Sequence, residues 1–258
     1  MTEKFDNIEP NFNFTGKTAL ITGAAQGVGA AIAKLIHKGG GRIAITDIDE
    51  AGAVNLAETL DPTNISTIGI KLDVREKDDF LAASNQVVKK WGKVDIVINN
   101  AGYAKRTPVN DISADEFDSI VAINMRSVFF SCQHFAEHMK KNGYGRIINI
   151  TSLAGQNGGT VASAHYSASK AGAIMLSKYF ARYLAGTGVT VNAIAPGPIS
   201  TAKQRLSSDQ ISAVEAQVPV GRFMETSEIA AAAALLASEQ GGFFMGSTLD
   251  MNGGLYLR

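Results

Sequence analysis

Short β-branched runs alternate with longer amphipathic runs from Lys17 to the end of the chain, and this alternation restricts the fold more than any single motif does. Strands separated by helical segments are typically joined by crossover helices into a parallel sheet. The runs predict strands over residues 18–21, 42–46, 65–72, 95–99, 145–150, 189–194 and 248–250, and helices over residues 27–38, 51–60, 77–91, 114–140, 165–185 and 227–238. We therefore expect an α/β fold with a doubly wound, parallel, seven-stranded sheet and helices on both faces.

The chain has no seam at which two domains would meet. Its 258 residues, 45% of them hydrophobic, suffice for one large core, and no composition shift, linker or repeat divides them. We expect an N-terminal arm over residues 1–14 and a single domain over residues 15–258. The stretch 196–219 is polar, is bounded by prolines and follows a strand's carboxyl end, where α/β sheets bind ligands. Residues 196–222 are therefore either a substrate lid or an ordinary surface loop with a short helix over Ser208–Gln217.

Charge and composition exclude several classes of partner. The 24 basic and 24 acidic residues are interspersed, so the chain lacks the charge pattern of a nucleic-acid or anionic-membrane binder. The longest apolar run, residues 229–237, is too short to span a membrane, and residues 1–14 lack the apolar core of a signal peptide. A lone cysteine, Cys132, excludes an internal disulfide. We expect a cytoplasmic protein whose partner is a small molecule.

A glycine-rich segment, Thr22 to Gly29, lies where the first predicted strand gives way to the first helix. Glycines allow a pyrophosphate to approach the backbone, and a helix amino terminus offers unpaired N–H groups to it. The spacing differs from the common dinucleotide fingerprint, because three residues separate the first two glycines. Asp47 closes the second strand, where a carboxylate can bind the adenosine ribose and would repel a 2′-phosphate. Since Gln26 is uncharged and no arginine follows Asp47, we predict that NAD is preferred over NADP.

Tyr166 and Lys170 stand four residues apart on a predicted helix and share one face of it. A lysine ammonium beside the phenol would lower the pKa of the tyrosine from about 10, so that the tyrosine could exchange a proton with an alkoxide. Taken alone, the pair is more simply a packed tyrosine with an incidental lysine neighbour. Ser167 and Lys170 also match a Ser-x-x-Lys acyl-transfer element, but the partner motifs of that element are missing.

The ordered motifs together resemble the short-chain dehydrogenase/reductase family over nearly the whole chain after Thr15. The motifs are Thr22-Gly23-x3-Gly27-x-Gly29, Asp73-Val74, Asn99-Asn100-Ala101-Gly102, Asn124, Ser152, Tyr166-x3-Lys170 and Pro196-Gly197-x-Ile199-x-Thr201. Any one of them could occur by chance, but the series in this order is specific. The resemblance implies a Rossmann-type fold. Ser152 precedes Tyr166 by one residue more than in many members, and we place the extra residue in the glycine-rich turn that follows Ser152.

Carried over by position, the resemblance implies a role for each motif residue. The implied catalytic residues are Asn124, Ser152, Tyr166 and Lys170, and the implied cofactor-binding residues are Gly23, Gln26, Gly27, Val28, Gly29, Asp47, Asp73, Val74, Asn100, Ala101, Gly102, Tyr166, Lys170, Pro196, Gly197, Ile199 and Thr201. Ser152 would polarise the substrate oxygen and Tyr166 would transfer the proton. Lys170 would lower the phenol pKa and hold the nicotinamide ribose, and Asn124 would kink its helix and hold a relay water.

These features predict an enzyme that transfers a hydride between NAD(H) and a secondary alcohol or ketone, such as a polyol or sugar. The alternative is a 3-oxoacyl-(acyl-carrier-protein) reductase, which fits the chain length but usually uses NADPH, against the indication of Asp47. A catalytically silent nucleotide-binding protein is a third hypothesis, which the intact catalytic set opposes. The family resemblance also implies a homodimer or homotetramer, and we predict a tetramer.

Two histidine signals remain. His134, Glu137 and His138 match a zinc-binding His-x-x-Glu-His pattern, but no further acidic ligand is indicated, so we predict no metal. His165 precedes Tyr166 and points about 100° away from it around the helix, so it either touches substrate or supports the site.

Overall fold

The computed structural model describes residues 12–159 and 162–257, so most of the predicted arm over residues 1–14 lies outside it. The strands are β1 Thr18–Thr22, β2 Arg42–Asp47, β3 Thr67–Lys71, β4 Ile96–Asn99, β5 Gly145–Ile150, β6 Val189–Pro196 and β7 Thr248–Met251. The α-helices are α1 Gly27–Lys38, α2 Glu50–Leu60, α3 Lys77–Trp91, α4 Ala114–Val121, α5 Ser127–Asn142, α6 Ala154–Asn157, α7 Ala164–Tyr183, α8 Ser208–Gln217 and α9 Thr226–Ala237. Shorter helical turns are η1 Val109–Asp111, η2 Ala122–Arg126, η3 Ser200–Arg205 and η4 Gln240–Phe243.

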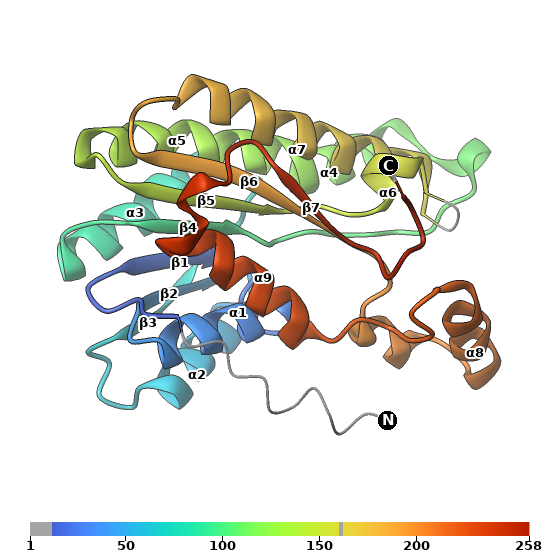
Figure 1. The fold of residues 1–258 in the computed structure, drawn as a ribbon, viewed down its shortest axis with the longest axis horizontal. Coiled ribbons are helices and arrows are strands. Elements are labelled where there is room, and N and C mark those ends of the chain that lie inside the picture. Colours follow the sequence, from blue (N-terminus) through green and yellow to red (C-terminus); the bar gives the residue numbers. More distant parts are fainter. Residues whose placement is uncertain (1–11, 160–161, 258) are drawn as a thin grey trace.

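The strands form one parallel sheet in the order β3-β2-β1-β4-β5-β6-β7 (Figure 1). The chain runs outward from β1 to β3, then crosses back to β4 and continues in the other direction. The order therefore reverses between β1 and β4. At such a switch point the loops after neighbouring strands diverge and leave a crevice, which is where open α/β sheets bind ligands.

Helices cover both faces of the sheet, as predicted (Figure 1). One core lies between the sheet and α1, α2 and α9, with α1 packed along α9. A second core lies on the opposite face, beneath α3, α5 and α7. Strands β1, β4, β5 and β6 are buried along their whole length, because helices cover them from both sides. The single-domain, Rossmann-type prediction is confirmed.

The helix predicted over residues 114–140 is interrupted. Helix α4 passes into the π-helical turn η2, which contains Asn124, and the chain then continues as α5. The Asn124 side chain bonds the backbone of Tyr103 in both directions: its Oδ1 accepts from Tyr103 N at 2.9 Å and its Nδ2 donates to Tyr103 O at 2.8 Å. A π-helical turn of this kind is a frequent mark of a functional position.

Strand β3 begins at Thr67, two residues later than predicted. The Asp61 carboxylate accepts hydrogen bonds from the backbone N–H groups of Ile65 and Ser66, at 2.9 and 2.7 Å. The backbone donors of these two residues are thus engaged in a turn instead of a strand ladder. No helix within the described ranges is long and apolar enough to cross a membrane.

Candidate active site

The loop between β1 and α1 is held against the end of β4, on the other side of the switch point. Asn100 Nδ2 donates to Thr22 O at 2.9 Å and to Gly23 O at 2.8 Å, while Thr22 Oγ1 accepts from the N–H groups of Asn100 and Ala101. A Cβ at Gly29 would stand 2.5 Å from Gly23 O and 2.6 Å from Asn100 Nδ2. Gly29 therefore has no room for a side chain, because the first turn of α1 packs directly against the backbone of Gly23.

The amino terminus of α1 faces this crevice without a capping side chain. Gln26 occupies the N-cap position and makes no side-chain cap bond, and the first turn contains no acidic residue. The partial positive charge of the helix end and its free N–H groups are left for an anion. Gln26 and Gly27 are exposed beside it, and Val28 is half-buried.

Two carboxylates follow β2 and β3 at the same edge of the sheet. Asp47 accepts hydrogen bonds from Ala25 N at 3.0 Å and Asp49 N at 3.1 Å, so its carboxylate lies against the glycine loop. Asp73 is paired with Arg75, whose side-chain hydrogen bond lowers the pKa of the Asp73 carboxyl. Val74 is buried in the second core, so its side chain packs inside the protein.

Ser152 and Tyr166 come from the loop after β5 and from the first turn of α7. Ser152 Oγ accepts from Ala154 N at 3.1 Å, which fixes the serine at the start of the α6 turn. Burial raises the pKa of the Tyr166 phenol, and a hydrogen bond with Ser152 partly offsets the rise. The sequence expectation that Lys170 lowers the phenol pKa is not met in this structure, where burial is the larger of the two effects on that pKa and the hydrogen bond with Ser152 is the other.

Lys170 lies one helical turn after Tyr166 and is 4% exposed. Its Nζ donates to Ile150 O at the end of β5, at 2.9 Å, and stands 6.0 Å from the centre of the Tyr166 ring. Burial lowers the pKa of Lys170 to about 8. The ammonium is thus held between the last residue of β5 and the phenol.

Gly102 lies where the side chains of Asn124 and Lys170 approach each other. A Cβ at Gly102 would lie 3.2 Å from both Asn124 Oδ1 and Lys170 Nζ. The absence of a side chain lets the π-helical turn and the buried lysine approach the same point. Asn124 Oδ1 and Lys170 Nζ therefore both lie next to the position that a side chain at Gly102 would occupy.

A cavity of about 510 Å³ opens over Ser152 and Tyr166. Its other walls come from the loop after β4, the loop after β6, and the segment that includes η3 and α8. The residues that line it include Ala104, Lys105, Arg106, Leu153, Ala162, Pro196, Gly197, Ala202, Leu206, Gln210, Val214, Val218 and Phe223. A second cavity, of about 600 Å³, lies beside Arg222, Asp250 and Tyr256 and contains neither Ser152 nor Tyr166, so it is not the site of these residues.

The predicted motif after β6 is only partly at the cavity. Pro196 and Gly197 line it, and Pro196 O accepts from Leu153 N at 2.9 Å. Ile199 instead forms a bridge with Met224, and Thr201 is exposed on η3 and does not line the cavity.

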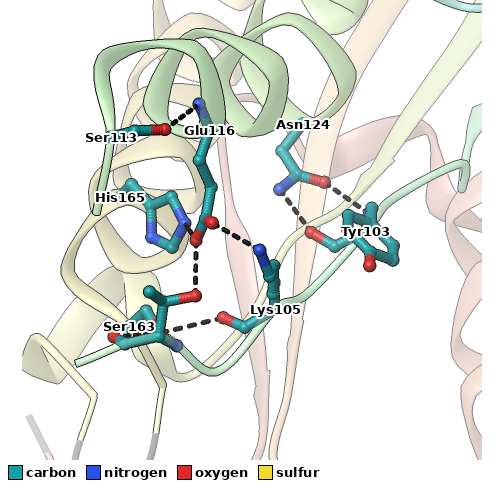
Figure 2. A network of polar contacts seen from close by, with 8 residues as sticks. Tyr103, Lys105, Ser113, Glu116, Asn124, Ser163 and His165 are labelled. Atoms are coloured by element: carbon teal, nitrogen blue, oxygen red, sulfur yellow. Dashed lines mark hydrogen bonds and ion pairs between the residues drawn. The ribbon is translucent and has the colours of Figure 1, made fainter. Parts of the chain in front are cut away.

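Sequence reasoning missed the polar cluster around Glu116, which includes the residue before Tyr166 (Figure 2). Glu116 of α4 contacts Lys105, Thr107 and His165, and Ser163 hydrogen-bonds the backbone of Lys105 and Thr107. His165 was recognised only as an open choice, and the structure places it in support: it is fully buried and does not line the cavity. The acidic Glu116 gave no signal, because an acidic residue in a helix's first turn is commonplace.

Residues of the His-x-x-Glu-His pattern form hydrogen bonds to different parts of the chain instead of converging on one point. His138 Nε2 accepts from Val94 N at 3.1 Å, whereas Glu137 accepts from Tyr183 Oη at 2.7 Å. Among the described residues no three His, Cys, Asp or Glu side chains are placed to hold a metal ion. Cys132 is buried, and burial raises the pKa of its thiol to about 12, so it is a packing residue.

Known proteins match this chain over almost its full length. Residues 23–256 match the family model described as enoyl-(acyl carrier protein) reductase. The chain is 39% identical to the 3-oxoacyl-(acyl-carrier-protein) reductase of Salmonella typhimurium, over 95% of this chain and 99% of that protein. It is 36% identical to the D-threitol dehydrogenase of Mycolicibacterium smegmatis, over 98% of this chain and 97% of that protein.

A solved structure shares the fold. It is described as a short-chain dehydrogenase/reductase, glucose/ribitol dehydrogenase, from Brucella melitensis, and matches with a TM-score of 0.87 at 29% identity, over 96% of this chain and 100% of that one. The sheet order, the glycine loop at the switch point and these matches agree, and the chain belongs to the short-chain dehydrogenase/reductase family.

Proposed function

We propose that this oxidoreductase interconverts a carbonyl and a secondary alcohol in the cavity over Ser152 and Tyr166. The observation that carries the proposal is the hydrogen-bonded Ser152 and Tyr166 pair at the wall of that cavity, with Lys170 buried one turn further along α7. Ser152 Oγ donates to the substrate oxygen, and Tyr166 Oη gives that oxygen its proton during reduction. In the oxidative direction the phenolate takes the proton back.

A nicotinamide dinucleotide fits the crevice between β1 and β4. Its pyrophosphate would lie at the uncapped amino terminus of α1, where Gly29 leaves no side chain in the way. Asp47 would hold the adenosine ribose, and Asn100, Ala101 and Gly102 would form the floor. When bound, the cofactor supplies or accepts the hydride at the carbonyl carbon. The chain's own residues orient the substrate and move the proton, so that hydride and proton together convert ketone to alcohol.

Lys170 has two tasks in this scheme. Its ammonium would oppose the rise in the Tyr166 pKa that burial causes, and it would hold the nicotinamide ribose. Asn124, whose Oδ1 lies near the same Cβ position of Gly102 as Lys170 Nζ, would hold a water that returns protons to the lysine. Both tasks need the positive charge, which a pKa of about 8 preserves near neutral pH.

For the substrate we favour a 3-oxoacyl thioester over a polyol. Relatives named 3-oxoacyl-(acyl-carrier-protein) reductases predominate among the matches, so the comparisons support this alternative better than the polyol hypothesis. The side chains of Leu153, Leu206, Val214 and Phe223 give the cavity an apolar wall, which suits an acyl chain. A polyol remains the second candidate, because the D-threitol dehydrogenase relative spans as much of the chain.

For the cofactor we favour NAD(H). Asp47 lies against the glycine loop through Ala25 N, so a 2′-phosphate on the adenosine ribose would meet a fixed carboxylate. The exposed Gln26 offers no compensating charge. This preference departs from the NADPH expected of an acyl-carrier-protein reductase.

We further infer that the chain assembles as a homotetramer or homodimer. Met175, Tyr179 and Tyr183 recur every four residues along α7 and are 62%, 63% and 50% exposed. A stripe of large apolar groups on one helix face is typical of a protein interface.

One set of assays tests the function. Acetoacetyl thioester, crotonyl thioester and threitol would each be offered with NADH, NADPH or their oxidised forms. We expect reduction of the acetoacetyl thioester with kcat/KM higher for NADH than for NADPH. Turnover of threitol alone would support a polyol substrate instead. Turnover of crotonyl thioester alone would mean that a carbon–carbon double bond is reduced, and would contradict the proposed carbonyl chemistry.

Active-site variants then test the residue roles. Tyr166→Phe should abolish turnover of the accepted substrate while NADH still binds. Ser152→Ala should lower kcat by about 100-fold to 1,000-fold, the usual loss of a donor to developing oxyanion charge. Near-normal kcat in Tyr166→Phe would refute the assignment, and bound NADH without turnover of any substrate would favour a silent binding protein.

A further inference from the structure

Glu116 connects three segments of the chain: its own helix α4, the loop after β4 and the start of α7 (Figure 2). Its Oε1 accepts a hydrogen bond from Thr107 Oγ1 at 2.5 Å and lies 3.0 Å from His165 Nε2. Its Oε2 accepts from Lys105 Nζ at 2.5 Å. The carboxylate thus joins α4 to the first turn of α7 through one oxygen and to the loop after β4 through both.

Glu116 is held as a carboxylate. Its side chain is 14% exposed, and the hydrogen bond from Lys105 is the largest of the effects that lower the pKa of Glu116 to about 2. Its charge is therefore constant across the pH range in which enzymes of this kind are assayed. A charged acceptor also makes stronger hydrogen bonds than a neutral one.

His165 depends on Glu116 for its orientation. The ring is fully buried, and the Phe117 ring stacks beside it with centroids 6.5 Å apart. Within the described part of the chain, His165 Nδ1 has no hydrogen-bond partner, so the contact with Glu116 is the polar contact that fixes the ring. His165 is covalently adjacent to Tyr166, and a change in its ring position would be transmitted to the tyrosine backbone.

The loop after β4 is fastened at both ends. Asn124 holds the backbone of Tyr103 at one end. At the other end Ser163 Oγ donates to Lys105 O at 2.8 Å and accepts from Thr107 N at 2.7 Å. Between these points Ala104, Lys105 and Arg106 form a wall of the cavity that also contains Tyr166.

We propose that Glu116 is a positioning residue for the reaction, which sets Tyr166 through His165 and sets the cavity wall of residues 104–106 through Lys105 and Thr107. This inference rests on the proposed function, because it requires Tyr166 to transfer the proton. The contacts of Glu116 have separate effects. The contact of Oε1 with His165 acts on the tyrosine and hence on kcat, whereas the contacts with Thr107 and Lys105 act on the substrate wall and hence on KM.

Three variants separate these contacts. Glu116→Ala removes all of them, Glu116→Gln keeps a carbonyl oxygen for His165 and Thr107 but loses the ion pair, and Lys105→Met removes the ion pair alone. The assays measure kcat and KM for the accepted carbonyl substrate, and the dissociation constant of NADH by fluorescence.

We expect Glu116→Ala to lower kcat by about 10-fold to 100-fold, because displacements of about 1 Å at a reacting group cost up to about 100-fold. Glu116→Gln should recover most of kcat but keep a raised KM, and Lys105→Met should raise KM alone. NADH affinity should stay within about twofold in all three, because neither Glu116 nor Lys105 is among the residues proposed to bind the cofactor.

Glu239→Gln is the control. Glu239 is a carboxylate paired with two cations, Lys17 and Arg146, and it lies at the opposite end of the strands. Because its side chain is 63% exposed, this variant should lose little stability, and it should keep wild-type kcat and KM. Loss of an ion pair in itself would affect both carboxylates, whereas a positioning role is confined to Glu116.

Tyr166→Phe measured in parallel separates the two proposals. Lost turnover in Tyr166→Phe together with a normal Glu116→Ala enzyme overturns the inference alone, whereas retained turnover in Tyr166→Phe overturns both. Equal loss of kcat and NADH affinity in Glu116→Ala would also overturn it. If Glu116→Ala does not fold, the proposal is tested with Glu116→Gln and Lys105→Met. An unchanged KM in both variants would contradict it.

Discussion

At the scale of single residues, Lys170 shows a conflict between chemistry and stability. The proposed chemistry needs an ammonium beside Tyr166, yet the side chain is almost completely buried, and its one described hydrogen bond is to Ile150 O. Burying a charge with so little compensation is costly, and the protein shows that cost as a lowered lysine pKa. Perturbed pKa values of this kind are characteristic of functional positions.

We predict that Lys170→Met stabilises the fold at pH 7 while abolishing activity. The pKa of Lys170 falls from 10.5 to about 8 on folding, which corresponds to a penalty of about 1–3 kcal/mol at neutral pH once the lost hydrogen bond is allowed for. Methionine has a similar shape and no charge to bury. Urea unfolding at pH 7 would measure the gain.

The pH dependence has a definite sign. Between about pH 8 and pH 10.5 the unfolded chain holds the Lys170 proton and the folded chain does not, so the free energy of unfolding contributed by this residue rises with pH. Below about pH 8 both states are protonated and the penalty is complete. Lys170→Met should lack this rise, and the exposed Lys178→Met on the same helix should leave both stability and its pH dependence unchanged. A Lys170→Met protein less stable than the wild type at pH 7 would contradict the prediction.

At the scale of elements, local signals predicted well those elements whose ends are set locally. The bounds of α1, α3, β5 and α8 agree with the prediction to the residue. Helix α3, for example, ends at Gly92, which adopts a left-handed backbone with φ of 86°. Such stop signals are present in the sequence itself.

Features that depend on distant contacts were not predictable in this way. Helical periodicity runs unbroken through Asn124, and the π-helical turn there depends on the bonds to Tyr103, 21 residues earlier. Glu116 meets His165 across 49 residues of sequence. Thr201 lies on the exposed η3 turn, and its assignment to the cofactor stays a prediction from the resemblance. Residue identity indicated the chemistry, but tertiary packing decides which side chains meet.

Helix α8 is the element on which we predict movement. It has no buried residue, although Gln210 and Val214 line the cavity, whereas α9 of similar length buries six of its residues. Elements with few buried contacts open most easily. Amide hydrogen exchange in α8 should therefore be fast in the free protein and slow when NADH and a substrate analogue are added, while exchange in α9 stays slow throughout. Protection of α8 equal to that of α9 without ligand would show an ordinary surface helix instead of a lid.

At the scale of the whole molecule, the sheet order brings two sets of residues to one edge. Residues after β1, at the end of β2 and after β4 line the crevice proposed for the dinucleotide, and residues after β5 and β6 contribute to the cavity with Ser152 and Tyr166. Parallel strands end at the same edge, so neither set needs a long loop to reach the other. Gly102 lies where the two meet, next to Asn124 and Lys170. Hydride and proton can therefore arrive at one carbonyl from neighbouring loops of a rigid scaffold.

The same architecture leaves α7 with an inner and an outer face. Lys170 points inward to β5, whereas Met175, Tyr179 and Tyr183 are exposed on the outside. The Phe180 ring lies beside those of Tyr179 and Tyr183 and beside that of Phe129 of α5, which is 37% exposed. We predict that this outer face joins two copies of the chain within a tetramer. Light scattering should give a tetramer mass for the wild type. Tyr179→Glu should reduce the mass to that of a dimer or monomer, because association would bury the new carboxylate in an apolar contact at a high cost in free energy.

Ile65→Glu is the control, since Ile65 is 73% exposed but lies away from this face, and the mass of this variant should not change. A monomeric wild type, or a Tyr179→Glu protein of unchanged mass, would show that the α7 face is not the interface.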